Sequence, residues 1–160
     1  MADCLFLQHF GFAMLNFDEF GYLKPYEAIP ASLEDIERHF VFNTRRETLY
    51  ASFKAFLKEL SMAEIKPLYV WVNGSFTTLK KYPKGIDLVV FVAFEIYNKT
   101  KKTRWLLRRK YAKTLDVFFE PEHPELHPLR SKTLDDRDYW LKLYCYDRKG
   151  FDKGILELKF

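Results

Sequence analysis

Cysteine is scarce in this sequence. Its 160 residues include two, Cys4 and Cys145, which lie far apart and match no metal-ligand spacing. Their number and placement exclude a disulfide framework and a cysteine-rich zinc module as the basis of the fold. Two ordinary thiols are typical of a reducing compartment, so we expect a cytoplasmic protein.

The sequence also lacks a large excess of charge of either sign and has no long apolar run. The net charge is +4, which is too small by itself to indicate a nucleic-acid partner. The apolar stretch 5–17 is short and is interrupted by Gln8 and His9, so it predicts no membrane span and resembles a signal peptide poorly. We interpret residues 1–17 as a strand or extended arm packed on the domain, or else as a partner-binding surface.

Apolar and aromatic residues are abundant, at 48% and 18% of the chain. This content is enough for a packed core, and the length suits one domain, which we place at residues 18–160. No internal repeat or low-complexity segment is visible. An α+β (or α/β) domain with a small mixed sheet flanked by helices is expected from the order of the elements that the sequence predicts.

Helices and strands are predicted from periodicity, capping residues and β-branched content. We expect Thr133 with Asp136 to cap the last helix, and His123 and His127 to lie at the surface of a proline-rich loop. The last strand should be half-exposed, and the strand from residue 86 should be central and covered on both faces. The predicted helices are 33–40 (after Ser32), 44–60 (after Asn43 or Thr44), 98–112 and 133–144, and the predicted strands are 68–72, 86–94, 115–119 and 154–160.

A Gly-Ser turn follows the first of these strands, at Gly74 and Ser75. Glycine lets the backbone approach a ligand closely, and serine offers a hydroxyl, so this turn suits phosphate binding. Lys80 and Lys84 follow in a basic loop and are candidates for contact with a triphosphate. The alternative is an ordinary turn serine in a solvated loop.

Two aspartates open the next strands, Asp87 and Asp116. If those strands are neighbours, the carboxylates converge beside the Gly-Ser turn and offer the hard oxygen ligands that magnesium prefers. Considered alone, Asp87 could instead make an Asx-type hydrogen bond, and Asp116 could pair with Lys113. The combination, in this order and strand context, favours nucleotide chemistry.

A second basic segment lies in the predicted helix 98–112. Its cations are candidates for nucleic-acid contact, and a solvated helix face is the alternative. The candidates are Lys101, Lys102, Arg104, Arg108 and Arg109.

The spacing of Gly74-Ser75, nine further residues, Gly85-Ile86-Asp87 and then Asp116 resembles the nucleotidyltransferase superfamily related to DNA polymerase beta. Within it, the chain is similar to an uncharacterised family of bacterial and phage proteins. The resemblance covers most of the chain from about residue 18 and is carried by segments 20–25, 45–46, 73–80, 86–91, 115–119, 147–150 and 153–157.

This resemblance implies a nucleotidyltransferase-like fold with Ser75 at the triphosphate of an NTP. It also implies Mg²⁺ held by Asp87 and Asp116, the latter helping to deprotonate the attacking hydroxyl. The first metal-ligand position is occupied by Gly85, which has no side chain to bind a metal.

Three functions follow from these features. The leading hypothesis is a degenerate transferase that binds nucleotide, nucleic acid or a protein partner. The resemblance implies a toxin–antitoxin or phage-defence setting, with a toxin or defence effector as that partner. The alternatives are an active Mg²⁺-dependent enzyme that moves NMP from NTP to a protein or RNA hydroxyl, and a structural protein with no nucleotide role.

Overall fold

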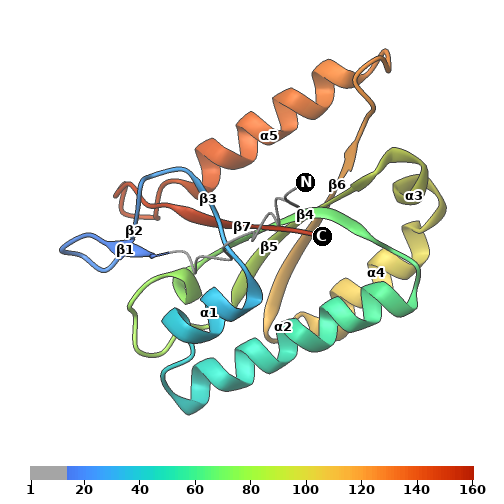
Figure 1. Cartoon of the computed structure of the whole chain (residues 1–160). Coiled ribbons are helices and arrows are strands. Elements are labelled where there is room, and N and C mark those ends of the chain that lie inside the picture. The colour runs from blue at the N-terminus through green and yellow to red at the C-terminus, as the bar shows by residue number, and fades with distance from the viewer. Residues whose placement is uncertain (1–13) are drawn as a thin grey trace, which may run out of the picture.

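The computed structural model describes residues 14–160, which are built around a five-stranded sheet (Figure 1). Strand β4 runs antiparallel to both of its neighbours, whereas β3 with β7 and β5 with β6 are parallel pairs, so the sheet is mixed. The predicted α+β class is confirmed. In spatial order the strands are β3 (Ala28–Pro30), β7 (Ile155–Lys159), β4 (Pro67–Asn73), β5 (Ile86–Ala93) and β6 (Leu115–Glu122).

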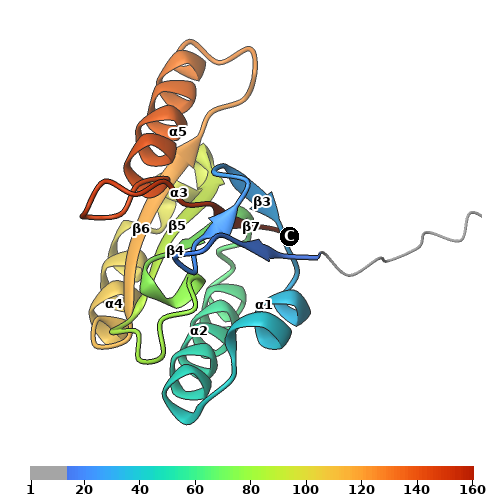
Figure 2. The ribbon, with the colours of Figure 1, turned by 90° about the vertical axis from the view of Figure 1, so that its left-hand side faces the viewer.

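Helices cover both faces of this sheet. Helix α5 lies on one face, and α1, α2 and α4 lie on the other (Figures 1 and 2). The short α3 follows β5 directly. The helices are α1 (Leu33–Phe40), α2 (Thr44–Met62), α3 (Phe94–Lys99), α4 (Lys101–Tyr111) and α5 (Arg130–Tyr144).

Strand β5 shows how the two layers divide the core. Its side chains alternate between faces, so Leu88 and Val90 join the larger cluster with α1, α2 and α4, while Val89 and Phe91 join the cluster under α5. All four are buried. The prediction of an interior strand covered on both faces is confirmed.

The first two helices begin where their capping residues predict. The Ser32 hydroxyl accepts a hydrogen bond from the Asp35 amide at 3.1 Å, and the Asp35 carboxylate accepts one from the Ser32 amide at 2.8 Å. The Asn43 side chain caps α2 by accepting from the amide of Arg46 at 3.0 Å. Local hydrogen bonds therefore fix both starts.

The capping box predicted at Thr133 is wrong. Helix α5 begins earlier, and Thr133 lies inside it with its hydroxyl accepting from the His123 amide at 3.0 Å. That contact also buries His123, which is 2% exposed instead of lying on the surface. The predicted helix 98–112 corresponds to α4, which begins three residues later, and residues 98 and 99 are the end of the separate helix α3.

The final strand differs from the prediction as well. β7 lies inside the sheet between β3 and β4, and Ile155, Leu156 and Leu158 are buried, so it is not half-exposed. Most of the predicted N-terminal arm lies outside the described residues, but β1 (Asn16–Phe17) pairs with β2 (Leu23–Lys24). None of the helices in residues 14–160 has the length and apolar character of a membrane span.

Candidate functional site

Asp87 and Asp116 are register partners in the parallel pair of β5 and β6. Residues paired in this way point to the same face, and adjacent strands lie about 4.8 Å apart. Both carboxylates therefore lie side by side on the face that α5 covers. The structure brings together the two aspartates that the sequence singled out.

The electrostatic environment of Asp87 disfavours a second negative charge. Burial and the nearby charge of Asp116 raise the pKa of the Asp87 carboxyl, while the cations of Lys153 and Arg148 act in the opposite direction. A raised pKa with these causes marks a site that a cation would stabilise.

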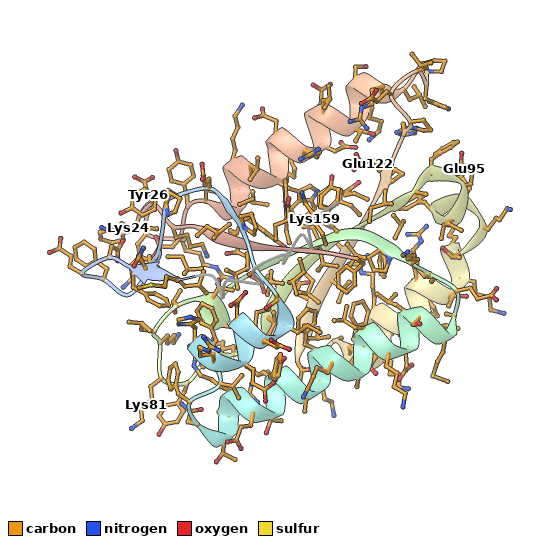
Figure 3. All side chains as sticks on the ribbon, in the orientation of Figure 1. Lys24, Tyr26, Lys81, Glu95, Glu122 and Lys159 are labelled. Atoms are coloured by element: carbon orange, nitrogen blue, oxygen red, sulfur yellow. The ribbon has the colours of Figure 1, made fainter. Side chains whose placement is uncertain are left out.

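Three other carboxylates share this face of the sheet, and each has a partner. Glu120 accepts a hydrogen bond from the Trp140 indole at 3.0 Å, and Glu157 accepts one from the Trp71 indole at 2.9 Å. Glu122, labelled in Figure 3 near α5, accepts from the Tyr69 hydroxyl at 2.5 Å. Trp140 belongs to α5 and Tyr69 and Trp71 belong to β4, so donors on the helix and on the sheet satisfy these acids.

Neither Asp87 nor Asp116 accepts a side-chain hydrogen bond from any residue between 14 and 160, in contrast to those three acids. The alternatives of an Asx-type bond at Asp87 and a Lys113 pair at Asp116 therefore have no counterpart in the described structure. Carboxylates on a sheet face without donors are available to a ligand.

The Gly-Ser turn lies against Asp87. Gly74 has a φ of +88°, and a Cβ added there would lie 3.0 Å from Cγ and Oδ2 of Asp87. Only glycine fits both this conformation and this close approach. Ser75, the next residue, is partly exposed and begins a short 3₁₀ turn, Ser75–Thr77.

Two buried polar atoms at the site have no hydrogen-bond partner among residues 14–160, and sequence reasoning gave neither residue a role. They are Asn73 Oδ1 and the Tyr144 hydroxyl. Asn73 is the register partner of Asp87 on the β4 side. Burial and the charges of Asp87 and Asp116 raise the pKa of Tyr144, which places its ring near both aspartates.

Lys153 brings a cation to the same region and was also missed as a site residue. It is 7% exposed, and burial lowers its pKa while the charges of Asp87 and Asp147 act to raise it. It forms no ion pair with a carboxylate in the described part of the chain. The signal in the sequence was a lysine two residues before the final strand.

Gly85 is packed too tightly to carry a side chain. A Cβ at this position would lie 2.8 Å from the backbone oxygen of Thr114, the same oxygen that accepts a hydrogen bond from the Ile86 amide at 3.0 Å. The glycine thus lets β5 approach the residue before β6.

No group of three acidic, histidine or cysteine side chains that could hold a metal occurs within residues 14–160.

A hard divalent cation nevertheless fits the residues present. The site offers two carboxylates in register and, beside them, the amide oxygen of Asn73 without a donor. Oxygen atoms of this kind are the ligands that Mg²⁺ and similar ions take in proteins.

The basic loop is anchored by α2. Arg46 is fully buried and donates to the carbonyls of Phe76 at 2.7 Å, Thr78 at 2.6 Å and Lys80 at 2.5 Å. Burial lowers the pKa of Arg46 to about 10, so it stays charged at neutral pH. The buried cation fixes the backbone of the loop by binding carbonyl oxygens.

The lysine side chains of this loop remain exposed. Asn43 donates to the Lys81 carbonyl at 2.8 Å, which places Lys81 beside the start of α2 (Figure 3). Arg45 donates to the Pro83 carbonyl at 3.1 Å and also binds the Lys84 carbonyl. Lys80 and Lys84 thus project cations from an ordered loop.

Helix α4 contributes one face to a groove of about 560 Å³ that reaches Asp116. Trp105, Arg108 and Arg109 line it from the helix, and the Arg109 guanidinium lies 4.7 Å from the Trp105 ring. Arg104 turns inward, is 8% exposed and donates to the Tyr97 carbonyl at 2.9 Å. Arg104 is therefore unavailable to a nucleic acid.

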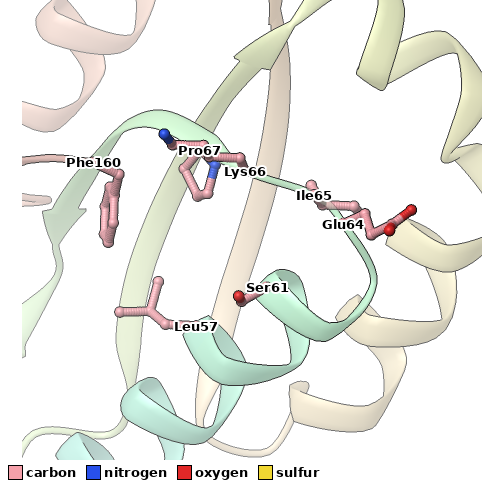
Figure 4. A pocket seen from close by; sticks show the side chains of 7 residues that line it. All are labelled: Leu57, Ser61, Glu64, Ile65, Lys66, Pro67 and Phe160. Carbon is pink, nitrogen blue, oxygen red and sulfur yellow. The ribbon is translucent and has the colours of Figure 1, made fainter.

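The remaining two candidates on α4, Lys101 and Lys102, are exposed but do not line this groove. A different, mainly apolar hollow of about 480 Å³ lies at the opposite end of β4, where Leu57, Pro67 and Phe160 meet (Figure 4). It contains none of the predicted site residues.

No curated protein and no solved structure matches the chain. A family model matches residues 15–159, which is most of the sequence and includes every residue of the site described above. The chain therefore belongs to the family described as a family of unknown function (DUF6932).

Proposed function

We propose that this protein has a nucleotidyltransferase-like fold and binds a nucleoside triphosphate together with a divalent cation. The observation that carries the proposal is the pairing of Asp87 with Asp116, two carboxylates in register on one face that accept no side-chain hydrogen bond from residues 14–160. The other carboxylates of that face are satisfied. A cation would neutralise this pair and the phosphate oxygens when bound.

The surrounding residues suit the parts of a nucleotide. We assign Ser75, the residue after Gly74, to the phosphates, and the exposed cations of Lys80 and Lys84 are candidates for the same role. Trp105 is 53% exposed and lines the groove that reaches Asp116, so we assign it to the base. Stacking on such a ring does not depend on base identity.

We expect the protein to bind NTP but to transfer NMP slowly, because Gly85 occupies the position of the first metal carboxylate. Losing a ligand from a two-metal site removes transition-state stabilisation, and about 1.4 kcal/mol corresponds to each tenfold loss in rate. The active alternative, transfer of NMP to a protein or RNA hydroxyl, is favoured by the convergence of Asp116 with Asp87. This alternative predicts that incubation with labelled NTP transfers the label to an acceptor.

Two further partners remain proposals. Lys101, Lys102, Arg108 and Arg109 are exposed and suit nucleic-acid phosphates. A protein partner, such as a toxin or defence effector, rests on the resemblance alone.

Thermal unfolding with Mg²⁺ and each NTP tests the proposal. A ligand at 100 times its Kd stabilises by about 2.7 kcal/mol, which for a chain of this size is roughly 5–11 °C. Asp87→Asn and Asp116→Asn should each abolish the shift. Glu125→Gln, an exposed acid in the loop before α5, should preserve it.

Absence of a shift with every nucleotide, or a full shift in Asp87→Asn, would contradict nucleotide binding at this site. Incubation with labelled NTP and candidate acceptors then separates binding from transfer. Labelling that disappears in Asp87→Asn would establish the active enzyme.

A further inference from the structure

Asn73 carries a buried oxygen that no residue in the described part of the chain satisfies. Its side chain is 3% exposed, and its Oδ1 and the Tyr144 hydroxyl are the buried side-chain polar atoms without a hydrogen-bond partner in residues 14–160. Both lie beside the aspartate pair. Buried polar atoms are normally bonded, so two exceptions beside one carboxylate pair make this place a candidate binding site.

We propose that Asn73 Oδ1 is the third oxygen ligand of a divalent cation held with Asp87 and Asp116. This inference rests on the proposed function and deepens it, because it names the residue that supplies what Gly85 cannot. The ligand set would be two carboxylates and one neutral amide oxygen. Such a set suits a small, hard cation such as Mg²⁺ or Mn²⁺.

The sheet places the three residues in one row. Asn73 pairs with Asp87 between β4 and β5, and Asp87 pairs with Asp116 between β5 and β6. Paired residues share a face, so all three side chains project toward α5 from neighbouring strands, over a Cα span of about 10 Å. A cation above the middle strand lies between the oxygens of both flanking strands.

Lys153, one of the two cations that act on Asp87, does not satisfy these oxygens. Lys153 is buried nearby, yet it neither donates to Asn73 nor forms an ion pair with either aspartate. An amide oxygen beside a carboxylate, with no donor between them, is unfavourable for the folded chain alone. A bound cation turns this repulsion into coordination.

Gly74 keeps the space around Asp87 open. A Cβ at Gly74 would come within 3.0 Å of the Asp87 carboxylate, on the chain segment directly after Asn73. The turn therefore leaves room at the oxygens that the proposed cation would contact.

The test is a Mn²⁺ titration followed by electron paramagnetic resonance of the free ion, with and without a non-hydrolysable NTP analogue. Asn73→Leu removes the oxygen with little change of shape, and Asn98→Leu makes the same exchange at an exposed position of α3. Asn73→Leu should weaken Mn²⁺ binding by about tenfold or more, as loss of metal-site partners does. Asn98→Leu should bind as the wild type.

A second measurement separates a ligand from a structural residue. Without metal, Asn73→Leu should melt at or above the wild-type temperature, since it removes an unsatisfied polar atom, whereas a structural asparagine would lower it. Equal Mn²⁺ affinity in Asn73→Leu and wild type would overturn the inference and leave nucleotide binding standing. Absence of Mn²⁺ binding by the wild type under both conditions would also overturn it, and nucleotide binding would then be judged by its own melting shifts.

Discussion

Restoring the missing carboxylate by Gly85→Asp should damage the protein instead of repairing the site. The new Cβ would lie 2.8 Å from the Thr114 backbone oxygen, which is closer than a side chain can approach without moving the backbone. Overpacking of this kind costs about 1–3 kcal/mol. The displaced oxygen also accepts from the Ile86 amide, a hydrogen bond that contributes about 1 kcal/mol.

The expected loss is therefore about 2–4 kcal/mol, which corresponds to a fall of roughly 4–16 °C in melting temperature for a chain of this size. Differential scanning calorimetry measures it directly. Gly85→Ala separates the steric effect from the added charge, and it should account for most of the fall. Because the Ile86–Thr114 contact begins the β5–β6 pair, the alignment of Asp87 with Asp116 should suffer too.

Asn73→Asp is the matched comparison, because it adds a third carboxylate at a position that already holds a side chain of that shape. We expect Mn²⁺ affinity to rise in Asn73→Asp and not in Gly85→Asp. The steric reasoning would be refuted by a Gly85→Asp protein that melts at the wild-type temperature and binds Mn²⁺ more tightly than the wild type. Gly85 would then mark only the loss of a metal ligand.

Three further substitutions test other parts of the structure. Arg46→Met should cost about 3–5 kcal/mol in chemical denaturation, because it leaves buried carbonyls without their charged donor. Asp87→Asn should stabilise the metal-free protein at pH 7, because burial and the charge of Asp116 raise the pKa of the Asp87 carboxyl above 3.8. The stability of the wild type therefore falls as the pH rises through the raised pKa. In melts at a series of pH values, the higher stability of Asp87→Asn should disappear below about pH 4. Trp105→Ala should weaken nucleotide binding by about 5- to 140-fold in calorimetric titration without changing the melting temperature, since Trp105 is 53% exposed.

Local signals predicted much of this fold. Ser32 and Asn43 cap their helices through hydrogen bonds to residues three positions along, which a sequence shows directly. The same kind of pattern failed at Thr133, because its hydroxyl bonds His123 across a loop instead of an amide at the helix start. Tertiary contacts decided that helix, and no local rule contains them.

The candidate site divides in the same way. Asp87 and Asp116 could be found because each opens an apolar strand, but their convergence depended on those strands being neighbours. Tyr144 and Lys153 reach the site only because α5 and the segment after it fold back over the sheet. Arg104 was assigned to the surface because a run of cations does not show which of its members faces the core.

Gly85 gains a positive role from this arrangement. The absence of a side chain at Gly85 permits the Ile86 amide to donate to the Thr114 carbonyl. That hydrogen bond immediately precedes the residue pairs that align Asp87 with Asp116. This chain therefore cannot combine a carboxylate at position 85 with the observed alignment of β5 and β6. For the proposed cation, a third oxygen would come from a residue already in the row. Within residues 14–160, the oxygen of Asn73, on the other side of Asp87, is buried there without a partner.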